Sequence, residues 1–179
     1  MTKIMRTELQ ILAFLFLAES SALEWNDCGG SEVDVRRLSL TPPVPTFPGE
    51  AYLAYTADVK KDIIDAKLEL SIKKKAFFLW IPIPCVSIGE IPLGSCSYDI
   101  CDTITHHGNI ICPILAEMSI PCSCPLVTGQ YKADRAVVRL PKVPTGLGFL
   151  TSGTYYIEAK AKVGNEQILC LDVTVEVQA

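Results

Sequence analysis

The residues best suited to chemistry in this chain are its eight cysteines. They are Cys28, Cys85, Cys96, Cys101, Cys112, Cys122, Cys124 and Cys170. An even number of cysteines in a chain with a secretory leader, described below, predicts four disulfides. Zinc is the rival chemistry, but no two cysteines have the C-x-x-C spacing and the two histidines are adjacent. We therefore expect no metal site, and bridging every cysteine leaves no thiol nucleophile.

Hydrolytic chemistry has no motif in this sequence. There is no G-x-S-x-G nucleophile turn and no H-E-x-x-H metal motif. His106 and His107 stand in a segment rich in cysteine and turn residues. We interpret them as a solvated pair in a disulfide-bound loop and not as a catalytic base. The sequence thus predicts a protein that is not an enzyme and needs no cofactor.

One apolar stretch has no ordinary strand or membrane-span pattern. It follows Lys73, Lys74 and Lys75 and reads Ala76-Phe77-Phe78-Leu79-Trp80-Ile81-Pro82-Ile83-Pro84-Cys85. It is too short for a membrane span, which needs about 20 apolar residues, and it lacks strict alternation. Two interpretations remain open: a strand buried on both faces, or an exposed segment that rims a lipid site and touches membrane.

The membrane interpretation has support from the chemistry of single side chains. Trp80 suits a membrane interface because its ring is apolar and its N–H stays wet. Each of the three lysines would contribute about 1 kcal/mol near anionic lipid. An ordinary solvated strand end is the alternative for these lysines.

The first residues form a separate segment. Lys3 and Arg6 precede an apolar run at residues 11–18, and Ser20-Ser21-Ala22 follows. This pattern is typical of a secretory signal peptide over residues 1–22. We expect residues 23–179 to form a single domain, with no later transmembrane segment. The net charge of −4 disfavours nucleic acid as a partner.

The remaining chain predicts an all-β domain. Residues 66–73 alternate cleanly, with Ala66, Leu68, Leu70 and Ile72 on one face. Four prolines in residues 41–49 favour an extended edge connection. Further strands are expected at residues 33–40, 52–59 and 130–140, with a hairpin of 154–163 and 168–177 about Gly164-Asn165. Short strands divided by Pro and Gly turns indicate an antiparallel sandwich.

The cysteine-rich middle, residues 85–124, gives weaker signals. Turns are predicted at Gly94-Ser95-Cys96 and at Gly108-Asn109, and residues 111–118 predict one or two helical turns. Cys122 and Cys124 would point to the same side of an extended chain, so each is expected to take a different partner. The spacing leaves the pairing otherwise open.

Several motifs together resemble the GM2-activator group of MD-2-related lipid-recognition proteins. The resemblance covers residues 23–179 and rests on Trp25-Asn26-Asp27-Cys28, Leu79-Trp80-Ile81-Pro82-Ile83-Pro84-Cys85, Gly94-Ser95-Cys96, Ile120-Pro121-Cys122-Ser123-Cys124-Pro125, Gly129-Gln130-Tyr131, Thr151-Ser152-Gly153-Thr154-Tyr155-Tyr156-Ile157-Glu158 and the final Cys170. It implies a β-cup, in which two antiparallel sheets enclose an apolar lipid cavity.

The resemblance also implies particular residues. The implied bridges are Cys28–Cys170, Cys85–Cys96, Cys101–Cys124 and Cys112–Cys122. The implied lipid-binding and membrane-contact residues are Phe77, Phe78, Leu79, Trp80, Ile114, Leu115, Met118, Leu147, Phe149 and Leu150.

The function implied by the resemblance is non-catalytic lipid transfer. Such a protein extracts glycosphingolipid or phospholipid from a membrane surface and presents it to a soluble glycosidase of the β-hexosaminidase kind. We expect a secreted or lysosomal protein. Asn26, Asn109 and Asn165 are not followed by the N-x-S/T pattern, so no glycan-dependent lysosomal route is indicated.

A second function remains open. The chain could be a secreted lipid- or sterol-binding interaction protein, of an immune, chemosensory or toxin-like kind, with no glycosidase partner. A carrier should retain an empty apolar volume, whereas an interaction domain could fill it. The long segments around residues 112–122 and 146–153 favour a ligand with bulky tails.

Overall fold

The computed structural model of the chain describes residues 23–87, 92–142 and 152–179. The expected signal peptide, residues 1–22, lies outside these ranges. So do Leu147, Phe149 and Leu150, three of the residues expected to contact lipid. None of the described helices is long and apolar enough to cross a bilayer.

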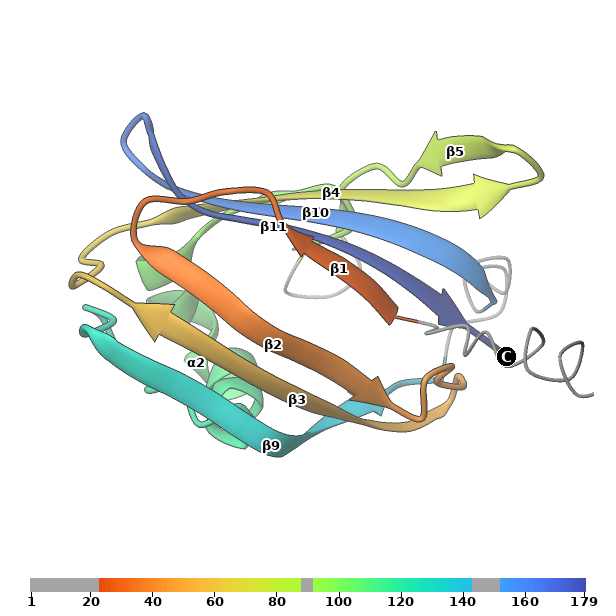
Figure 1. Cartoon of the computed structure of the whole chain (residues 1–179), viewed down its shortest axis with the longest axis horizontal. Coiled ribbons are helices and arrows are strands. Elements are labelled where there is room, and N and C mark those ends of the chain that lie inside the picture. Colours follow the sequence, from red (N-terminus) through yellow and green to blue (C-terminus); the bar gives the residue numbers. More distant parts are fainter. Residues whose placement is uncertain (1–22, 88–91, 143–151) are drawn as a thin grey trace, which may run out of the picture.

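Two antiparallel sheets face each other and form the body of the molecule (Figure 1). The large sheet has the order β1-β11-β10-β4-β5, with β8 also paired to β4, and the small sheet has the order β2-β3-β9. The strands are β1 Leu23–Asp27, β2 Val33–Thr41, β3 Gly49–Val59, β4 Lys67–Ala76, β5 Leu79–Pro82, β6 Val86–Ser87, β7 Pro92–Leu93, β8 Ser97–Asp99, β9 Gly129–Leu140, β10 Gly153–Val163 and β11 Glu166–Val177. β6 and β7 pair separately. The predicted two-sheet, all-β fold class is confirmed.

The period-2 alternation of the strands separates a polar outer face from an apolar inner face. On β10, Lys160 and Lys162 point outward and form ion pairs, while Ile157 and Ala161 line apolar cavities. β4 pairs with β10 so that Ile72 lies opposite Ile157 and Glu69 lies opposite Lys160. The alternation predicted for residues 66–73 is therefore confirmed.

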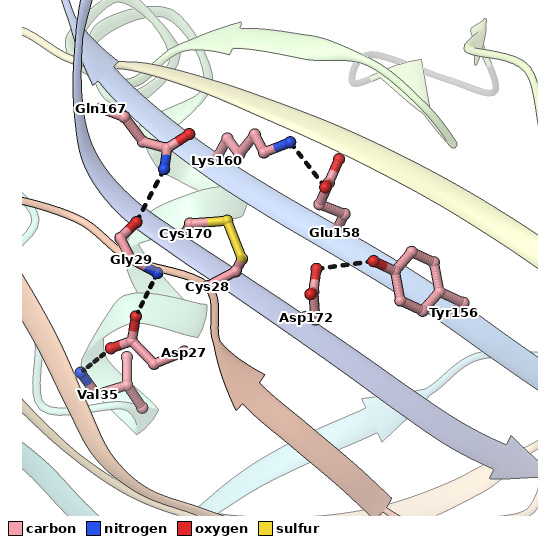
Figure 2. Close-up of a disulfide and its surroundings, with 10 residues drawn as sticks. All are labelled: Asp27, Cys28, Gly29, Val35, Tyr156, Glu158, Lys160, Gln167, Cys170 and Asp172. Carbon is pink, nitrogen blue, oxygen red and sulfur yellow. Dashed lines mark hydrogen bonds and ion pairs between the residues drawn. A yellow bond between two sulfur atoms is a disulfide. The ribbon is translucent and has the colours of Figure 1, made fainter.

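Four disulfides join all eight cysteines. They are Cys28–Cys170, Cys85–Cys96, Cys101–Cys124 and Cys112–Cys122, the same four pairs that the resemblance implied. The first ties the end of β1 to β11 (Figure 2), and the Cys28 N–H also donates to the Cys170 carbonyl. The first and last strands of the described chain are thus joined side by side.

The cysteine-rich middle contains more helix than the sequence predicted. Helix α2 spans Ile100–Glu117, 18 residues, and bends at His107. Asp99 caps its first turn by accepting a hydrogen bond from the Asp102 N–H at 3.0 Å. The predicted turn at Gly108-Asn109 and the histidine loop are wrong. Gly108 and Pro113 disfavour helix locally, but Cys101 and Cys112 bridge to the segment after the helix and hold both halves.

Candidate functional site

An apolar cavity of about 260 Å³ lies among the two sheets and α2. Its lining is almost entirely hydrocarbon and consists of Val33, Tyr55, Ala57, Val59, Ile63, Ala66, Ile100, Cys101, Ile104, Leu115, Ile120, Pro121, Ser123, Cys124, Leu126, Tyr131, Ala161, Ile168 and Leu169. No Asp, Glu, Lys, Arg or His is among these residues. The cavity therefore suits hydrocarbon and offers no charged group to a ligand.

Small side chains and a disulfide keep this space open. Ala57, Ala66 and Ala161 stand at inward positions of the strands or just before them, where larger side chains would fill the volume. Ile100 and Ile104 lie one helical turn apart on α2 and share the face turned to the sheets. The Cys101–Cys124 bridge, whose two residues also line the cavity, fixes the start of α2.

Two tyrosines line the cavity, Tyr55 and Tyr131, and of these Tyr55 belongs to the buried core. Its hydroxyl donates to the Met118 carbonyl at 2.7 Å. Burial, with a smaller effect from Tyr131, raises the pKa of Tyr55. Because its hydroxyl is used on the protein itself, Tyr55 presents mainly its ring to the cavity.

A second apolar cavity, of about 290 Å³, lies farther along the same inner face. Its lining consists of Phe47, Ile72, Ile83, Val86, Leu93, Gly94, Tyr155, Ile157, Val175 and Val177. β10 and β11 contribute to both cavities: Ala161 and Ile168 to the first, Ile157 and Val175 to the second. The inner face of the large sheet is thus apolar along most of its length.

The stretch after the three lysines forms an exposed hairpin. β4 continues through Lys73–Lys75, turns at Phe77 and Phe78, and returns as β5 at the edge of the sheet (Figure 1). Phe77 is 97% exposed and Phe78 is 85% exposed. Leu79 and Trp80 are 59% and 42% exposed. The alternative of a strand buried on both faces is therefore wrong.

The structure separates the predicted lipid-contact residues into different settings. Leu115 lines the first cavity, Ile114 is 54% exposed, and Met118 packs against the core cluster around Tyr55. The hairpin residues Phe77 to Trp80 are not among the lining of either cavity. The described residues thus comprise an interior apolar site and a separate exposed apolar tip.

Sequence reasoning missed most of the cavity lining. Ile100 and Ile104 have the i, i+4 spacing that marks one helical face, a signal that could have found them. Tyr55, Ala57 and Val59 alternate along β3 and could have been assigned to the inner face. Ile120 lies in irregular chain and Leu126 in a single-residue bridge to Ile63, so neither carries a periodic signal.

Two polar groupings lie outside these cavities. His106 and His107 border a polar pocket of about 300 Å³ with Asp99 and Asp102. Ligand-type atoms of Cys28, Cys170 and Asp172 come within 4.8 Å of one another. Both of these sulfurs are bonded in a disulfide (Figure 2), so neither is a thiolate able to bind a metal.

The comparison with known families decides the relationship. The profile of the ML domain matches residues 22–177. The chain belongs to the ML-domain family. It is 26% identical over 164 residues to the ganglioside GM2 activator of Mus musculus, covering 88% of this chain and 82% of the relative. The ganglioside GM2 activator of Macaca fascicularis is 26% identical over 176 residues, covering 90% of each chain. The resemblance predicted from the motifs is confirmed.

Two solved structures align with the chain at low sequence identity. A Niemann-Pick type C2 protein from Japanese carpenter ant aligns with a TM-score of 0.46 at 12% identity, over 86% of this ML-domain chain and 98% of its own. Chicken MD-1 complexed with lipid IVa aligns with a TM-score of 0.40 at 14% identity, over 89% and 94% of the respective chains.

Proposed function

We propose that this ML-domain protein is a non-catalytic lipid carrier, formed by a single domain over residues 23–179. The observation that supports this most directly is the apolar cavity among the sheets and α2. A lipid leaves a bilayer only where another apolar environment replaces the hydrocarbon. Each CH₂ group of the lipid that is kept out of water contributes about 0.8 kcal/mol. A lining without charged side chains supplies that environment.

The β4–β5 hairpin is the proposed membrane contact of the carrier. Phe77 and Phe78 expose two aromatic rings at its turn. Exposure of adjacent large apolar side chains is typical of a surface that contacts a membrane or another molecule. Ile114 and the apolar residues Leu147, Phe149 and Leu150 are proposed as further contacts. Insertion of these side chains would bring the cavity to the source of its ligand.

The relationship to ganglioside GM2 activators supports a more specific role. The proposed cargo is a glycosphingolipid or a phospholipid, and the proposed action is to present glycolipid to a soluble glycosidase of the β-hexosaminidase kind. The test is hydrolysis of vesicle-bound ganglioside by soluble β-hexosaminidase with and without this protein. Stimulation would support the activator role. Lipid transfer without stimulation would favour the alternative, a lipid- or sterol-binding interaction protein.

Lipid binding is tested on the secreted protein by native mass spectrometry, lipid extraction and transfer of fluorescent lipid between vesicles. Co-purified lipid and transfer are expected for the parent protein. The Phe78→Asp, Trp80→Ala double variant should retain bound lipid but lose transfer. Ala57→Phe, which fills the first cavity, should lose bound lipid and keep vesicle binding. A folded, disulfide-intact parent protein that neither holds nor moves lipid would contradict the proposal.

The proposed location is the secretory pathway, with the mature protein secreted or lysosomal. Expression of the full chain in cultured cells, followed by sequencing of the protein's first residues, tests this. A mature chain beginning at Leu23 is expected. Retention of residues 1–22 in the purified protein would contradict the assigned signal peptide.

A further inference from the structure

The outer face of the large sheet carries a cluster of basic and aromatic side chains beside the hairpin. This basic–aromatic cluster consists of Lys73, Lys75, Trp80 and Tyr156. The register places Lys73 opposite Tyr156 and Lys75 opposite Trp80. These positions are out of phase with Ile72 and Ile157, which line the second cavity. The cluster therefore lies on the opposite face of the sheet from both cavities.

The two lysines are held over aromatic rings and not by carboxylates. The Lys73 Nζ lies 5.5 Å from the centroid of the Tyr156 ring, and the Lys75 Nζ lies 5.9 Å from that of Trp80. The two ring centroids are 6.0 Å apart. Among the described residues, neither lysine forms an ion pair. Two ammonium groups are thus held over neighbouring rings on one face of the sheet without a carboxylate partner among the described residues.

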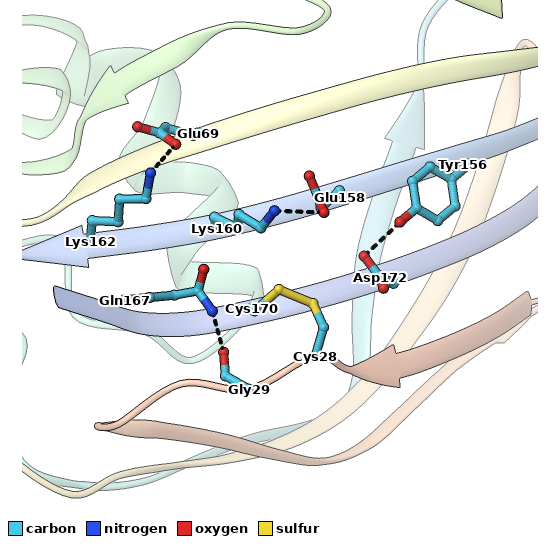
Figure 3. A network of polar contacts seen from close by, with 10 residues as sticks. All are labelled: Cys28, Gly29, Glu69, Tyr156, Glu158, Lys160, Lys162, Gln167, Cys170 and Asp172. Carbon is cyan, nitrogen blue, oxygen red and sulfur yellow. Dashed lines mark hydrogen bonds and ion pairs between the residues drawn. A yellow bond between two sulfur atoms is a disulfide. The ribbon is translucent and has the colours of Figure 1, made fainter. Parts of the chain in front are cut away.

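The same face shows the opposite arrangement farther from the hairpin. Lys162 pairs with Glu69 and Lys160 pairs with Glu158, each at 2.7 Å (Figure 3). The nearby Asp172 accepts a hydrogen bond from the Tyr156 hydroxyl at 2.8 Å. Glu69 and Glu158 are therefore paired with other lysines, whereas Asp172 keeps its negative charge while it accepts from Tyr156. Within a chain of net charge −4, the basic–aromatic cluster therefore offers two lysines without an ion pair to an anion from outside.

The position of the cluster behind the hairpin turn indicates where that anion lies. Lys75 precedes Phe77 by two residues and Lys73 precedes it by four, which is about 7 and 13 Å along a strand. Apolar groups of peripheral proteins enter a bilayer by about 5–10 Å. With Phe77 and Phe78 inserted, Lys75 and Trp80 would lie at the level of the lipid headgroups.

We propose that the basic–aromatic cluster is a second lipid site, which binds the phosphate groups of anionic phospholipids at the membrane surface. This inference rests on the proposed membrane contact of the hairpin. The cluster binds headgroups of the membrane, whereas the cavity takes the tails of the cargo. The ring beneath each ammonium group restricts the lysine without neutralising it. The carrier would then select membranes by their charge.

The test uses the secreted protein and flotation with vesicles of phosphatidylcholine alone or with added phosphatidylserine. The parent protein should prefer the anionic vesicles, and high salt should abolish the preference. The K73Q/K75Q variant should bind anionic vesicles about fivefold more weakly per lysine removed, or about 25-fold in all. Its binding to phosphatidylcholine vesicles should not change.

The K160Q/K162Q variant is the matched control, because it removes two positive charges from the same face at the paired positions. Its preference for anionic vesicles should fall much less than that of K73Q/K75Q, since Lys160 and Lys162 are already paired with Glu158 and Glu69 and stand four and six residues from Tyr156 along β10. An equal loss in both variants would overturn the proposal, as would a parent protein without preference. Equally strong, lysine-dependent binding to soluble polyglutamate would overturn the membrane as the occupant.

Lipid loading, measured by native mass spectrometry on the same preparations, separates this inference from the proposed function. K73Q/K75Q should carry as much bound lipid as the parent protein, because the cluster does not line a cavity. Absence of bound lipid in the parent protein would contradict the proposed function. If the parent protein carries lipid but shows no preference for anionic vesicles, only the proposed headgroup site is contradicted.

Discussion

Tyr156 shows how one side chain on the outer face of the large sheet is fixed by its neighbours. Its hydroxyl donates to Asp172 at 2.8 Å, and Trp80 packs against its ring. The hydrogen bond to Asp172, burial, and the charges of Asp172 and Glu158 raise the pKa of Tyr156 to about 12, from an ordinary value of 10.0. The phenol therefore stays protonated well beyond the pH at which an exposed tyrosine ionises.

Replacement of Asp172 by Asn should lower the pKa of Tyr156 toward 10.0, because the charge that opposes ionisation is removed. An NMR titration of the tyrosine ring carbons measures this. Tyr98 is the internal control, since burial alone raises its pKa, and it should titrate identically in both proteins. An unchanged pKa of Tyr156 in Asp172→Asn would show that the hydrogen bond does not govern its ionisation.

The same shift sets a pH dependence of stability. The pKa of Tyr156 is higher in the folded than in the unfolded protein, so its pairing with Asp172 stabilises the fold fully below pH 10. That contribution should fall as the pH rises toward about 12. Urea unfolding of the parent and of Asp172→Asn should therefore give free energies that converge over this alkaline range. A difference that stays constant to pH 12 would contradict the assignment.

At the scale of elements, Ser95 fixes the base of the β4–β5 hairpin. Its hydroxyl accepts from the Ile72 N–H at 2.9 Å and donates to the Ile83 carbonyl at 2.6 Å. One side chain therefore joins β4 to the chain that follows β5. The exposed turn at Phe77 and Phe78 makes few contacts of its own, so this anchor should decide how rigidly the hairpin stands.

Ser95→Ala should destabilise the protein by about 1–3 kcal/mol, because it leaves the partly buried Ile72 N–H without its acceptor, while the Ile83 carbonyl keeps the bond from the N–H of residue 95. Hydrogen exchange should accelerate at the Ile72 amide more than at amides of β11. Ser97→Ala, a change at an exposed position of β8, is the control and should have little effect. Equal exchange rates in parent and Ser95→Ala would mean that backbone pairing alone holds the hairpin.

The strands were predictable because burial on one face imposes a period that the sequence records. Residues 66–73 alternate strictly, and β4 follows with its apolar side inward. Helix α2 was not predictable to the same extent. Gly108 and Pro113 oppose helix locally, and the disulfides that override them join residues distant in the chain. A pairing between distant residues leaves no local pattern.

The cavity was predictable only through resemblance. Its volume depends on how far apart the sheets stand and on small side chains such as Ala57 and Ala161. An alanine at an inward position reads from sequence as an ordinary core residue. The exposed hairpin was ambiguous for a related reason, because the run from Phe77 to Trp80 has the composition of a core. Only the turn at Phe77 and the edge position of β5 place it in solvent.

For the whole molecule, two of the four disulfides have different roles: Cys28–Cys170 joins β11 to the segment after β1, and Cys101–Cys124 borders the first cavity. Cys28–Cys170 closes a loop with a sequence separation of 142, and Cys101–Cys124 one of 23. In the chain-entropy description, the longer loop contributes about 5 kcal/mol and the shorter about 3 kcal/mol to stability. Of the eight cysteines, only Cys101 and Cys124 line the first cavity.

Replacing each pair by serines should therefore give opposite orders for stability and for lipid loading. C28S/C170S should have the lower midpoint in urea, because it frees the longest loop, yet it should carry lipid when folded at low temperature. C101S/C124S should unfold at higher urea but carry less lipid, because the start of α2 is released from the segment that completes the cavity wall. Native mass spectrometry beside urea titrations measures both quantities. If lipid loading followed stability in both variants, Cys101–Cys124 would act only by stabilising the fold, and the cavity wall beside it would not determine lipid binding.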